Sequence, residues 1–166
     1  MRQKILALGH DFWVKDLEDH NVFYVDNKLF ALRKTYLILD EHNHEVLKVQ
    51  HKPLHIHWTM DIEQDGKVIA SIQKNLISPL LDRWTIVVPD GENLSAQGDL
   101  FDHEYTIQGS GKQLAHISKQ WFAIRQSYGI EMADGVNVPL MIAIAVAIDD
   151  MMDTLHAEQT KSDHSH

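Results

Sequence analysis

Apolar and polar residues alternate with a period of two along much of this chain. The alternation is clearest over residues 54–63, where one set of positions is apolar and the other polar: Leu54, Ile56, Trp58, Met60 and Ile62 against His55, His57, Thr59, Asp61 and Glu63. Successive side chains of a strand point to opposite faces, so this pattern is typical of an antiparallel strand with one buried face. The chain is therefore predicted to be mainly β.

Strand-like segments also recur at a nearly regular spacing. One set of segments opens with an apolar residue, at Val22, Val46, Val68, Leu94 and Leu114. Each is followed by a segment in which an aromatic and an aliphatic residue flank one other residue, beginning at Tyr36, Trp58, Trp84, Tyr105 and Tyr128. The N-terminal residues fit as a further copy, with strands near 4–6 and 12–14. A repeat of this kind indicates six copies of one two-stranded unit.

Residues that reverse the chain direction separate these units. They occur at 40–44, 65–66, 90–91, 109–111 and 134–135, where Asp and Gly predominate. Such residues supply the positive φ angles and side-chain hydrogen bonds of tight turns, and Asp-Gly between alternating segments is a strong hairpin signal. Six hairpin units would give twelve strands, and closing so large a sheet leaves a lumen that side chains alone do not fill. We therefore expect a twelve-stranded antiparallel barrel with a plug.

The apolar run from Val138 to Leu155 is the candidate plug. Its alternation of large and small residues over 142–148 would also fit a buried strand. Pro139 suits the first turn of a helix, and Met151 and Met152 continue the apolar character at helical offsets, so a helix is favoured. The residues expected to build this core helix are Pro139, Ile142, Ile144, Ala145 and Ile148, with Asp149 at the end of the run.

The domain prediction follows from this reading. Residues 1–155 are expected to form one barrel domain with a central helix, and residues 156–166, which are polar and lack periodicity, a disordered tail. An uninterrupted apolar run of about eleven residues is too short for a membrane span of about 20, so no transmembrane segment is expected.

Charge and cysteine content narrow the classes of partner. The chain has 15 Lys and Arg against 24 Asp and Glu, a formal charge of −9, and it has no cysteine. An acidic chain is not expected to bind nucleic acid or an anionic membrane through bulk electrostatics, although a local basic patch could still act. No disulfide framework is available, and a cytoplasmic location, with peripheral contact to a membrane, is expected.

The repeated strand starts, the stretch from Lys119 to Gly135 and the run from Pro139 to Met152 resemble the LURP-one-related family. The resemblance covers roughly residues 1–155 and implies a Tubby-like barrel of twelve strands around a hydrophobic C-terminal helix, a fold shared with phospholipid scramblases. Tubby domains bind phosphoinositide headgroups and scramblases act on membrane lipids, whereas most LURP-one-related members have no assigned biochemistry.

Two departures from the scramblase pattern are visible. The loop that corresponds to the scramblase calcium-binding segment holds only two carboxylates, Glu131 and Asp134, so calcium binding is not expected. The helix is also interrupted by Asp149, Asp150 and Asp153, which argues against a scramblase-like membrane anchor.

A recurrent lysine is the strongest residue-level hint of a ligand. Lys28, Lys52 and Lys74 each follow their unit's apolar start by six residues, and Lys4 and Lys119 fall near the matching position. With the adjacent pair Arg33 and Lys34, these residues could form a cationic ring for a phosphate-bearing headgroup. Lysine at strand ends also keeps hairpins soluble and discourages edge pairing, and this alternative stays open. The candidate ligand-binding residues are Lys28, Arg33, Lys34, Lys52, Lys74 and Lys119.

Histidines and aspartates raise the question of a metal. His55 and His57 fall on the polar face of one strand, His42, His44 and His51 lie in or near turns, and His164 and His166 are at the C-terminus, so no metal site is predicted. Asp149, Asp150 and Asp153 could hold a cation. Alternatively, Asp149 hydrogen-bonds the backbone of a loop or strand end at the barrel mouth.

Known catalytic signatures are absent from the sequence. There is no cysteine, no GxSxG motif, no P-loop and no GxGxxG, and Gly109-Ser110-Gly111 is read as a turn. We expect no cofactor and a non-enzymatic binding module for a lipid headgroup or another anionic ligand. The alternative is a protein-interaction or regulatory domain with an acidic surface, and scramblase-like lipid handling is a more distant one. The oligomeric state is not predicted.

Overall fold

A computed structural model describes residues 2–8, 11–28, 33–52, 59–74, 82–99, 104–118 and 127–163. Within these residues the chain forms twelve β-strands followed by one α-helix. The strands are β1 (Arg2–Leu8), β2 (Asp11–Lys15), β3 (Asn21–Asn27), β4 (Thr35–Asp40), β5 (Glu45–His51), β6 (Thr59–Gln64), β7 (Lys67–Lys74), β8 (Asp82–Val87), β9 (Leu94–Asp99), β10 (Glu104–Gly109), β11 (Lys112–Ser118) and β12 (Ser127–Met132), and the helix is α1 (Val138–Asp163). The prediction of a mainly β chain with a C-terminal helix is confirmed.

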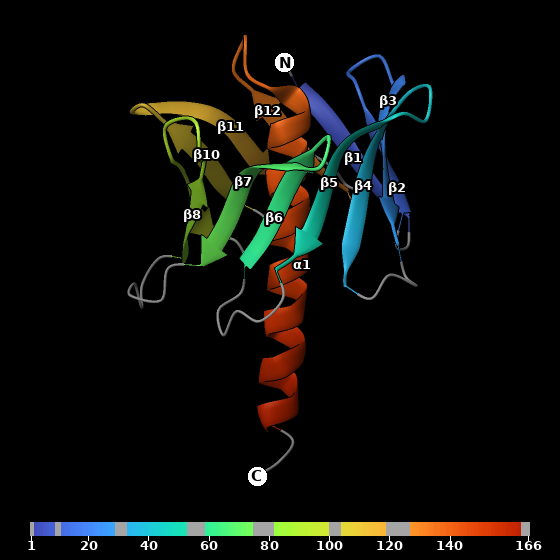
Figure 1. The fold of residues 1–166 in the computed structure, drawn as a ribbon. Coiled ribbons are helices and arrows are strands. Elements are labelled where there is room, and N and C mark those ends of the chain that lie inside the picture. The colour runs from blue at the N-terminus through green and yellow to red at the C-terminus, as the bar shows by residue number, and fades with distance from the viewer. Residues whose placement is uncertain are drawn as a thin grey trace.

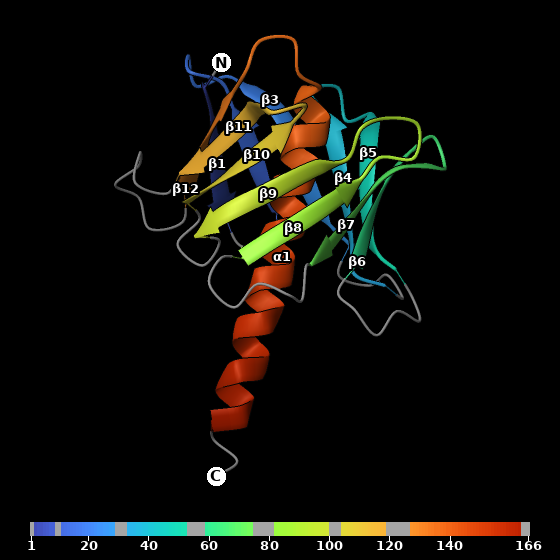
Figure 2. The same ribbon diagram turned by 90° about the vertical axis from the view of Figure 1, so that its left-hand side faces the viewer.

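Each strand pairs with its neighbours in the sequence, and every pairing is antiparallel. The order runs from β1 to β12 around a closed barrel, because β1 pairs with both β2 and β12. Figures 1 and 2 show the strands surrounding α1, which runs along the barrel axis and projects beyond it. The rim opposite this projection carries the tight turns.

The two rims differ in their connections. We call the rim built by the turns around 16–20, 40–44, 65–66, 88–93 and 110–111, together with the loop 133–137, the hairpin end. Several of these turns contain residues with positive φ, among them Asn43, Asp65 and Ser110, as the turn-forming sequence predicts. We call the other rim, where β3, β5 and β7 end and α1 leaves the barrel, the exit end (Figure 1).

The barrel interior is apolar and is filled by α1. From Met141 to Ile148 every side chain of the helix is buried, and Ala143, Ala145 and Ala147 are 0% exposed. Alanine leaves little side-chain volume between the helix and the wall, so the large inward residues of the strands can pack against the helix. The strands contribute Val14, Val25, Ile38, Val49, Ile62, Ile72, Ile86, Ile107, Ile117 and Ile130 to the same core.

The structure shows that the apolar run is a helix and not a strand, and that most of the predicted disordered tail is helical as well. Residues 142–148 are helical, and the helix continues to Asp163 instead of ending near Leu155. Once a buried segment has nucleated a helix, each further residue adds a hydrogen bond at low cost, and this segment contains no Pro or Gly to stop it. Residues 164–166 lie outside the described chain. In the described part, α1 is not apolar enough over a sufficient length to cross a bilayer.

Candidate functional site

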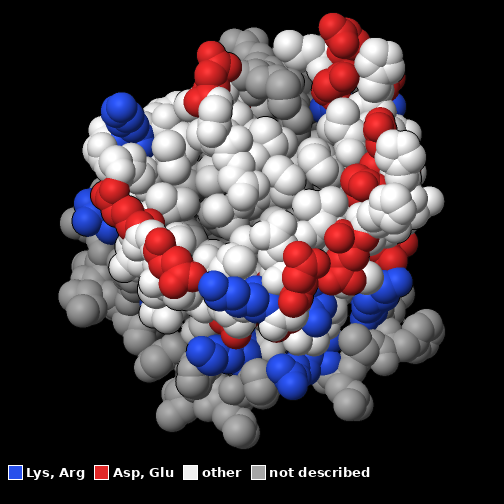
Figure 3. Space-filling view, turned by 45° about the horizontal axis from the view of Figure 1, so that its top comes forward, with Lys and Arg blue, Asp and Glu red and all other residues white. Residues whose placement is uncertain are grey.

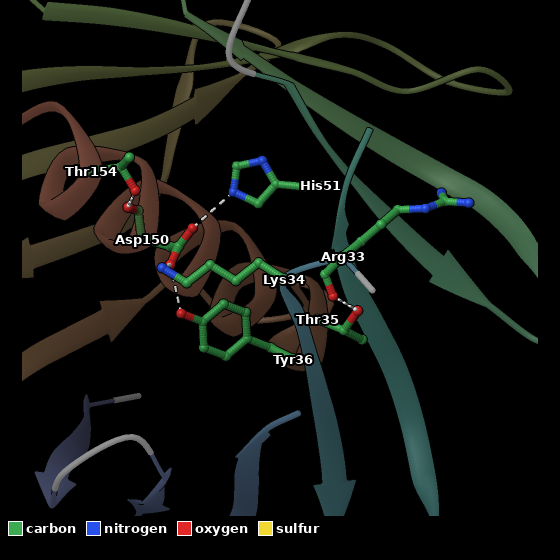
Figure 4. Close-up of polar contacts among 7 residues, drawn as sticks. All are labelled: Arg33, Lys34, Thr35, Tyr36, His51, Asp150 and Thr154. Carbon is green, nitrogen blue, oxygen red and sulfur yellow. Dashed lines mark hydrogen bonds and ion pairs between the residues drawn. The ribbon is translucent and has the colours of Figure 1, made fainter. Parts of the chain in front are cut away.

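A buried aspartate of α1 lies near the exit end, where the helix is about to leave the barrel. Asp150 is 4% exposed, although it follows directly on the apolar run. Its Oδ1 accepts a hydrogen bond from Tyr36 Oη at 2.6 Å, and His51 Nε2 lies 3.1 Å from its Oδ2. The Lys34 ammonium group forms an ion pair with the same carboxylate (Figure 4). This one side chain therefore joins three residues of the barrel wall.

The strand pairing explains why these partners converge. Lys34 and Tyr36 flank the first residue of β4, and His51 is the last residue of β5. The backbone N–H of His51 donates to the Lys34 carbonyl at 3.2 Å, which holds the two residues side by side. Within the helix, Thr154 Oγ1 donates to the Asp150 carbonyl at 2.9 Å and so ties the next turn to the same point.

The carboxylate is stabilised in its charged form. Burial raises the pKa of Asp150, but hydrogen bonds from His51, Lys34 and Tyr36 outweigh burial and hold that pKa below its usual value. For Tyr36, burial and then the hydrogen bond to Asp150 raise the pKa of the phenol far above its ordinary range. At neutral pH the site therefore contains an ionised Asp150 and a neutral Tyr36, with the phenol as donor.

A group of basic residues surrounds this cluster at the exit end. Lys28 and Lys52 directly follow β3 and β5, Lys74 ends β7, and Arg33 and Lys34 precede β4. Alternate strands of an antiparallel barrel end at the same rim, so all of these residues lie on the exit end. The backbone N–H of Lys28 donates to the Thr35 carbonyl at 2.9 Å, which places the Lys28 backbone beside the start of β4.

These cations differ in how they are paired. Lys28 forms an ion pair with Asp26, and Lys34 forms one with Asp150. The Arg33 side chain extends away from Asp150 (Figure 4), and Arg33 and Lys52 are both exposed. Among the described residues neither Arg33 nor Lys52 has an ion pair, so both can contribute charge to a ligand approaching this rim.

Some predicted residues fall elsewhere. Lys119 lies outside the described residues, as do His55, His57, His164 and His166. Lys4 is opposite Lys15 in the β1–β2 pairing, which places it toward the hairpin end and not with the other lysines. The ligand-binding role of the remaining basic residues stays a prediction.

The sequence did not identify the aspartate that the structure buries. Asp149, which we expected to hydrogen-bond the backbone of a loop or strand end at the rim of the barrel, is half-buried. That hydrogen bond stays a prediction. The deeper residue is its neighbour Asp150, which three side chains of the wall contact. No pattern distinguishes the two aspartates, because α1 is buried on all sides up to Ile148 and has no polar face to set the rotation.

Within the described part of the chain, potential metal ligands do not converge at the three aspartates. Among the described residues, the group close enough to share an ion is Asp16, Glu18 and His20, in the exposed turn between β2 and β3. His20 Nδ1 lies 3.2 Å from Asp16 Oδ2 there. The neighbouring turn between β4 and β5 repeats this arrangement, with His44 Nδ1 3.4 Å from Asp40. Both histidines thus pair with the aspartate that opens their own turn.

Comparison with known proteins places the chain in a family. The uncharacterized protein YxjI of Bacillus subtilis (strain 168) is 22% identical over 149 residues, which cover 90% of each chain. The crystal structure of a protein from Arabidopsis thaliana matches with a TM-score of 0.69 over 90% of each chain at 12% identity, a likeness of fold alone. The family model described as LURP-one-related matches residues 1–149, nearly the whole chain. The protein therefore belongs to the LURP-one-related family.

Proposed function

We propose that this protein is a non-enzymatic binding module that takes an anionic small ligand, such as a phosphorylated lipid headgroup, at the exit end of its barrel. The observation that carries the proposal is the gathering of Lys28, Arg33, Lys34, Lys52 and Lys74 on one rim. These residues are spread over more than forty positions of the sequence. The antiparallel strand order places all of them at the same end of the barrel.

The chemistry of the rim suits phosphate. Arginine offers a planar pair of donors that matches two phosphate oxygens, and lysine offers a mobile point charge. Arg33 and Lys52 are exposed on neighbouring strand ends, and Lys34, which follows Arg33 in the sequence, forms an ion pair with the buried Asp150. The Tubby-like barrel that the family resemblance implies is associated with headgroup binding, which adds a reason to test lipids first.

Flotation with phosphatidylcholine vesicles, with and without phosphoinositide, tests this proposal. The double variant Arg33→Gln/Lys52→Gln should weaken phosphoinositide-dependent binding roughly tenfold or more at low salt, because each cation near an anionic surface contributes about 1 kcal/mol. The matched control is Lys67→Gln/Lys112→Gln, which removes the same charge from the hairpin end and should bind as the unmodified protein does.

Calorimetry with inositol hexakisphosphate distinguishes a soluble anion from a membrane lipid. Binding to vesicles without binding to this anion would make the ligand a lipid surface, and binding to the anion alone would make it a soluble phosphate. If neither probe binds, or if both double variants lose binding equally, a specific site at the exit end is refuted. A cytoplasmic location, peripheral at a membrane, stays a prediction.

A further inference from the structure

The hairpin end carries apolar surface that the barrel does not fully cover. Aliphatic residues at the hairpin-end termini of several strands, in the loop before α1 and in its first turn pack against the core and remain partly exposed. We call them the apolar mouth: Val22, Val46, Val88, Leu94, Leu114, Val136, Val138 and Leu140. Leu17, in the neighbouring turn between β2 and β3, is 71% exposed and is the one large apolar residue classed as exposed in the described chain.

The apolar mouth is closely packed across neighbouring strands. A methyl group added at Gly109 would lie 2.5 Å from Leu94 Cδ2 and 3.1 Å from Leu114 Cδ1, so these leucines from β9 and β11 both cover β10. Val88 packs equally closely over Gly91, because a Cβ added at Gly91 would lie 3.0 Å from Val88 Cγ1. The exposed parts of these side chains therefore belong to a preformed surface.

Acidic residues surround this surface. The turns and strand ends of the rim carry ten acidic residues: Asp16, Glu18, Asp19, Asp40, Glu41, Glu45, Asp65, Asp90, Glu92 and Asp134. The described strand segments and turns at this end contain five basic residues, Arg2, Lys4, Lys15, Lys67 and Lys112. Figure 3 shows acidic side chains around a central uncharged area at this end of the molecule. The rim thus has an excess of negative charge, in contrast to the basic group at the exit end.

Contacts between turns hold the acidic rim in place. Lys67 forms an ion pair with Asp90 at 2.8 Å, which links the β6–β7 turn to the β8–β9 loop. Glu92 accepts a hydrogen bond from the Ser110 backbone N–H at 3.1 Å, which links that loop to the β10–β11 turn. Asp16 and Asp40 each accept two backbone N–H groups within their own turns. A rim fixed in this way loses little entropy when it binds a partner.

We propose that the hairpin end docks a basic amphipathic segment of a partner protein. Apolar side chains of the segment would contact the apolar mouth and Leu17, and its flanking Lys and Arg residues would face the acidic rim. Charge complementarity selects this occupant, because an apolar centre within a negative rim attracts cationic peptides and repels anionic membranes. On a helix, apolar residues three and four positions apart form one continuous face, and Lys and Arg beside that face can reach the surrounding acidic rim.

A second copy of the chain matches this surface less well. Its projecting part of α1 presents exposed Asp153, Ala157, Glu158 and Thr160, which supply neither large apolar anchors nor an excess of positive charge. The partner is therefore expected to be a different chain, one that carries its own apolar and basic residues on one helix face.

A synthetic peptide of about 18 residues tests the proposal. It places Leu at helical spacing on one face and Lys on the other. Its controls are the same peptide with Glu in place of Lys, and a scrambled peptide with no apolar face. Fluorescence anisotropy should show salt-sensitive binding of the Leu/Lys peptide at least about tenfold tighter than that of either control. Methyl NMR of the complex should shift Leu94, Leu114 and Leu140.

Two charge-reversal variants, one at each end of the barrel, test whether the peptide binds at the hairpin end. Glu18→Lys/Glu41→Lys reverses two exposed rim charges and should weaken binding about tenfold or more. Asp153→Lys/Glu158→Lys makes the same charge change on exposed positions of α1 at the other end and should change binding by less than about twofold. Leu17→Ser removes the exposed apolar side chain without touching the core and should also weaken binding.

Five results would overturn the proposal, and four of them come from the experiments above. These are equal binding of the Leu/Glu peptide, equal loss in both charge-reversal variants, methyl shifts confined to the exit end, and self-association that the rim variant abolishes. The last result would show that the occupant is a second copy. Binding of anionic vesicles that depends on Glu18 and Glu41 would likewise contradict a site for a cationic segment.

Discussion

Tyr36 Oη donates a hydrogen bond of 2.6 Å to Asp150 Oδ1 and thereby joins the start of β4 to the helix that fills the barrel. Both side chains are buried, at 8% and 4% exposure. A short hydrogen bond to an ionised acceptor is stronger than a neutral one, and an unpaired buried carboxylate is costly. The pair therefore fixes the depth of α1: a shift of the helix by one turn would separate Asp150 from all of its partners.

Asp150→Asn should destabilise the fold by about 2 kcal/mol at neutral pH. The amide keeps the shape of the carboxylate but loses its charge, which weakens the bonds from Tyr36 and His51 and leaves the Lys34 ammonium without its counter-ion. Lys34 is 43% exposed, so water compensates part of the loss. Urea unfolding measures the change. Asp153→Asn, on an exposed position of the same helix, should stay within about 0.5 kcal/mol.

The contribution of Asp150 should disappear in acid. Its folded pKa lies below its unfolded pKa of about 3.9, so the stability that it provides is complete above that value and is lost as the pH falls through the folded pKa. The difference in unfolding free energy between the unmodified protein and Asp150→Asn should be constant from about pH 6 to 5 and shrink below about pH 4. A difference that stays constant down to pH 3 would contradict the charged site.

Tyr36→Phe should cost about 2 kcal/mol at neutral pH and should flatten the alkaline limb of the stability curve. The pKa of Tyr36 is raised by burial and by Asp150, so its stabilising contribution is present below the unfolded pKa of about 10 and is lost as the pH rises above it. Thermal unfolding between pH 8 and 11 measures both effects. Parallel curves for the two proteins would show that Tyr36 does not titrate on unfolding.

The strand pattern of this protein is readable because inward and outward residues alternate on short, similar hairpins. The apolar starts at Val22, Val46 and Leu94 fall within one residue of the start of a strand, and the predicted turns at Asp65 and Ser110 have positive φ. The length of α1 could not be predicted from the sequence in the same way. Its last residues are polar and have no periodicity, and their helical state depends on propagation from the buried segment, a cooperative effect that no local pattern records.

The candidate sites could be predicted only in part from the sequence, for a related reason. The recurrence placed Lys28, Lys52 and Lys74 on one rim, since residues at equal positions in equal units lie at equal heights, but it did not hold for Lys4, which lies toward the other rim. The contact between Tyr36 and Asp150 joins residues 114 apart and depends on the rotation of a helix that is apolar on all sides. The apolar mouth has no sequence signature, because its members have the same residue types and spacing as ordinary core residues. Their partial exposure follows from where the barrel ends.

Gly98→Ala should destabilise the fold by about 3 kcal/mol. Gly98 has a φ of +140°, and an added Cβ would lie 2.5 Å from the Glu104 carbonyl oxygen and 2.8 Å from Tyr105 Cα. These are backbone atoms of the paired strand β10, so they cannot move away without breaking the pairing. Gly111→Ala is the matched control. Its φ is +68°, but no atom lies within 4 Å, so only the conformational cost of about 1 kcal/mol should appear.

Ala145→Asp should abolish folding. Ala145 is 0% exposed at the centre of the barrel, where no described partner could pair with a carboxylate, so the substitution adds both volume and an unpaired charge to an apolar interior. The cost of several kcal/mol or more approaches the total stability of a domain of this size. Circular dichroism and gel filtration of the expressed protein provide the measurement. Ala157→Asp, on an exposed position of the same helix beyond the barrel, makes the same chemical change and should fold normally. A folded Ala145→Asp variant would mean that α1 does not fill the barrel, and the fixed depth assigned to the Tyr36–Asp150 pair would lose its basis.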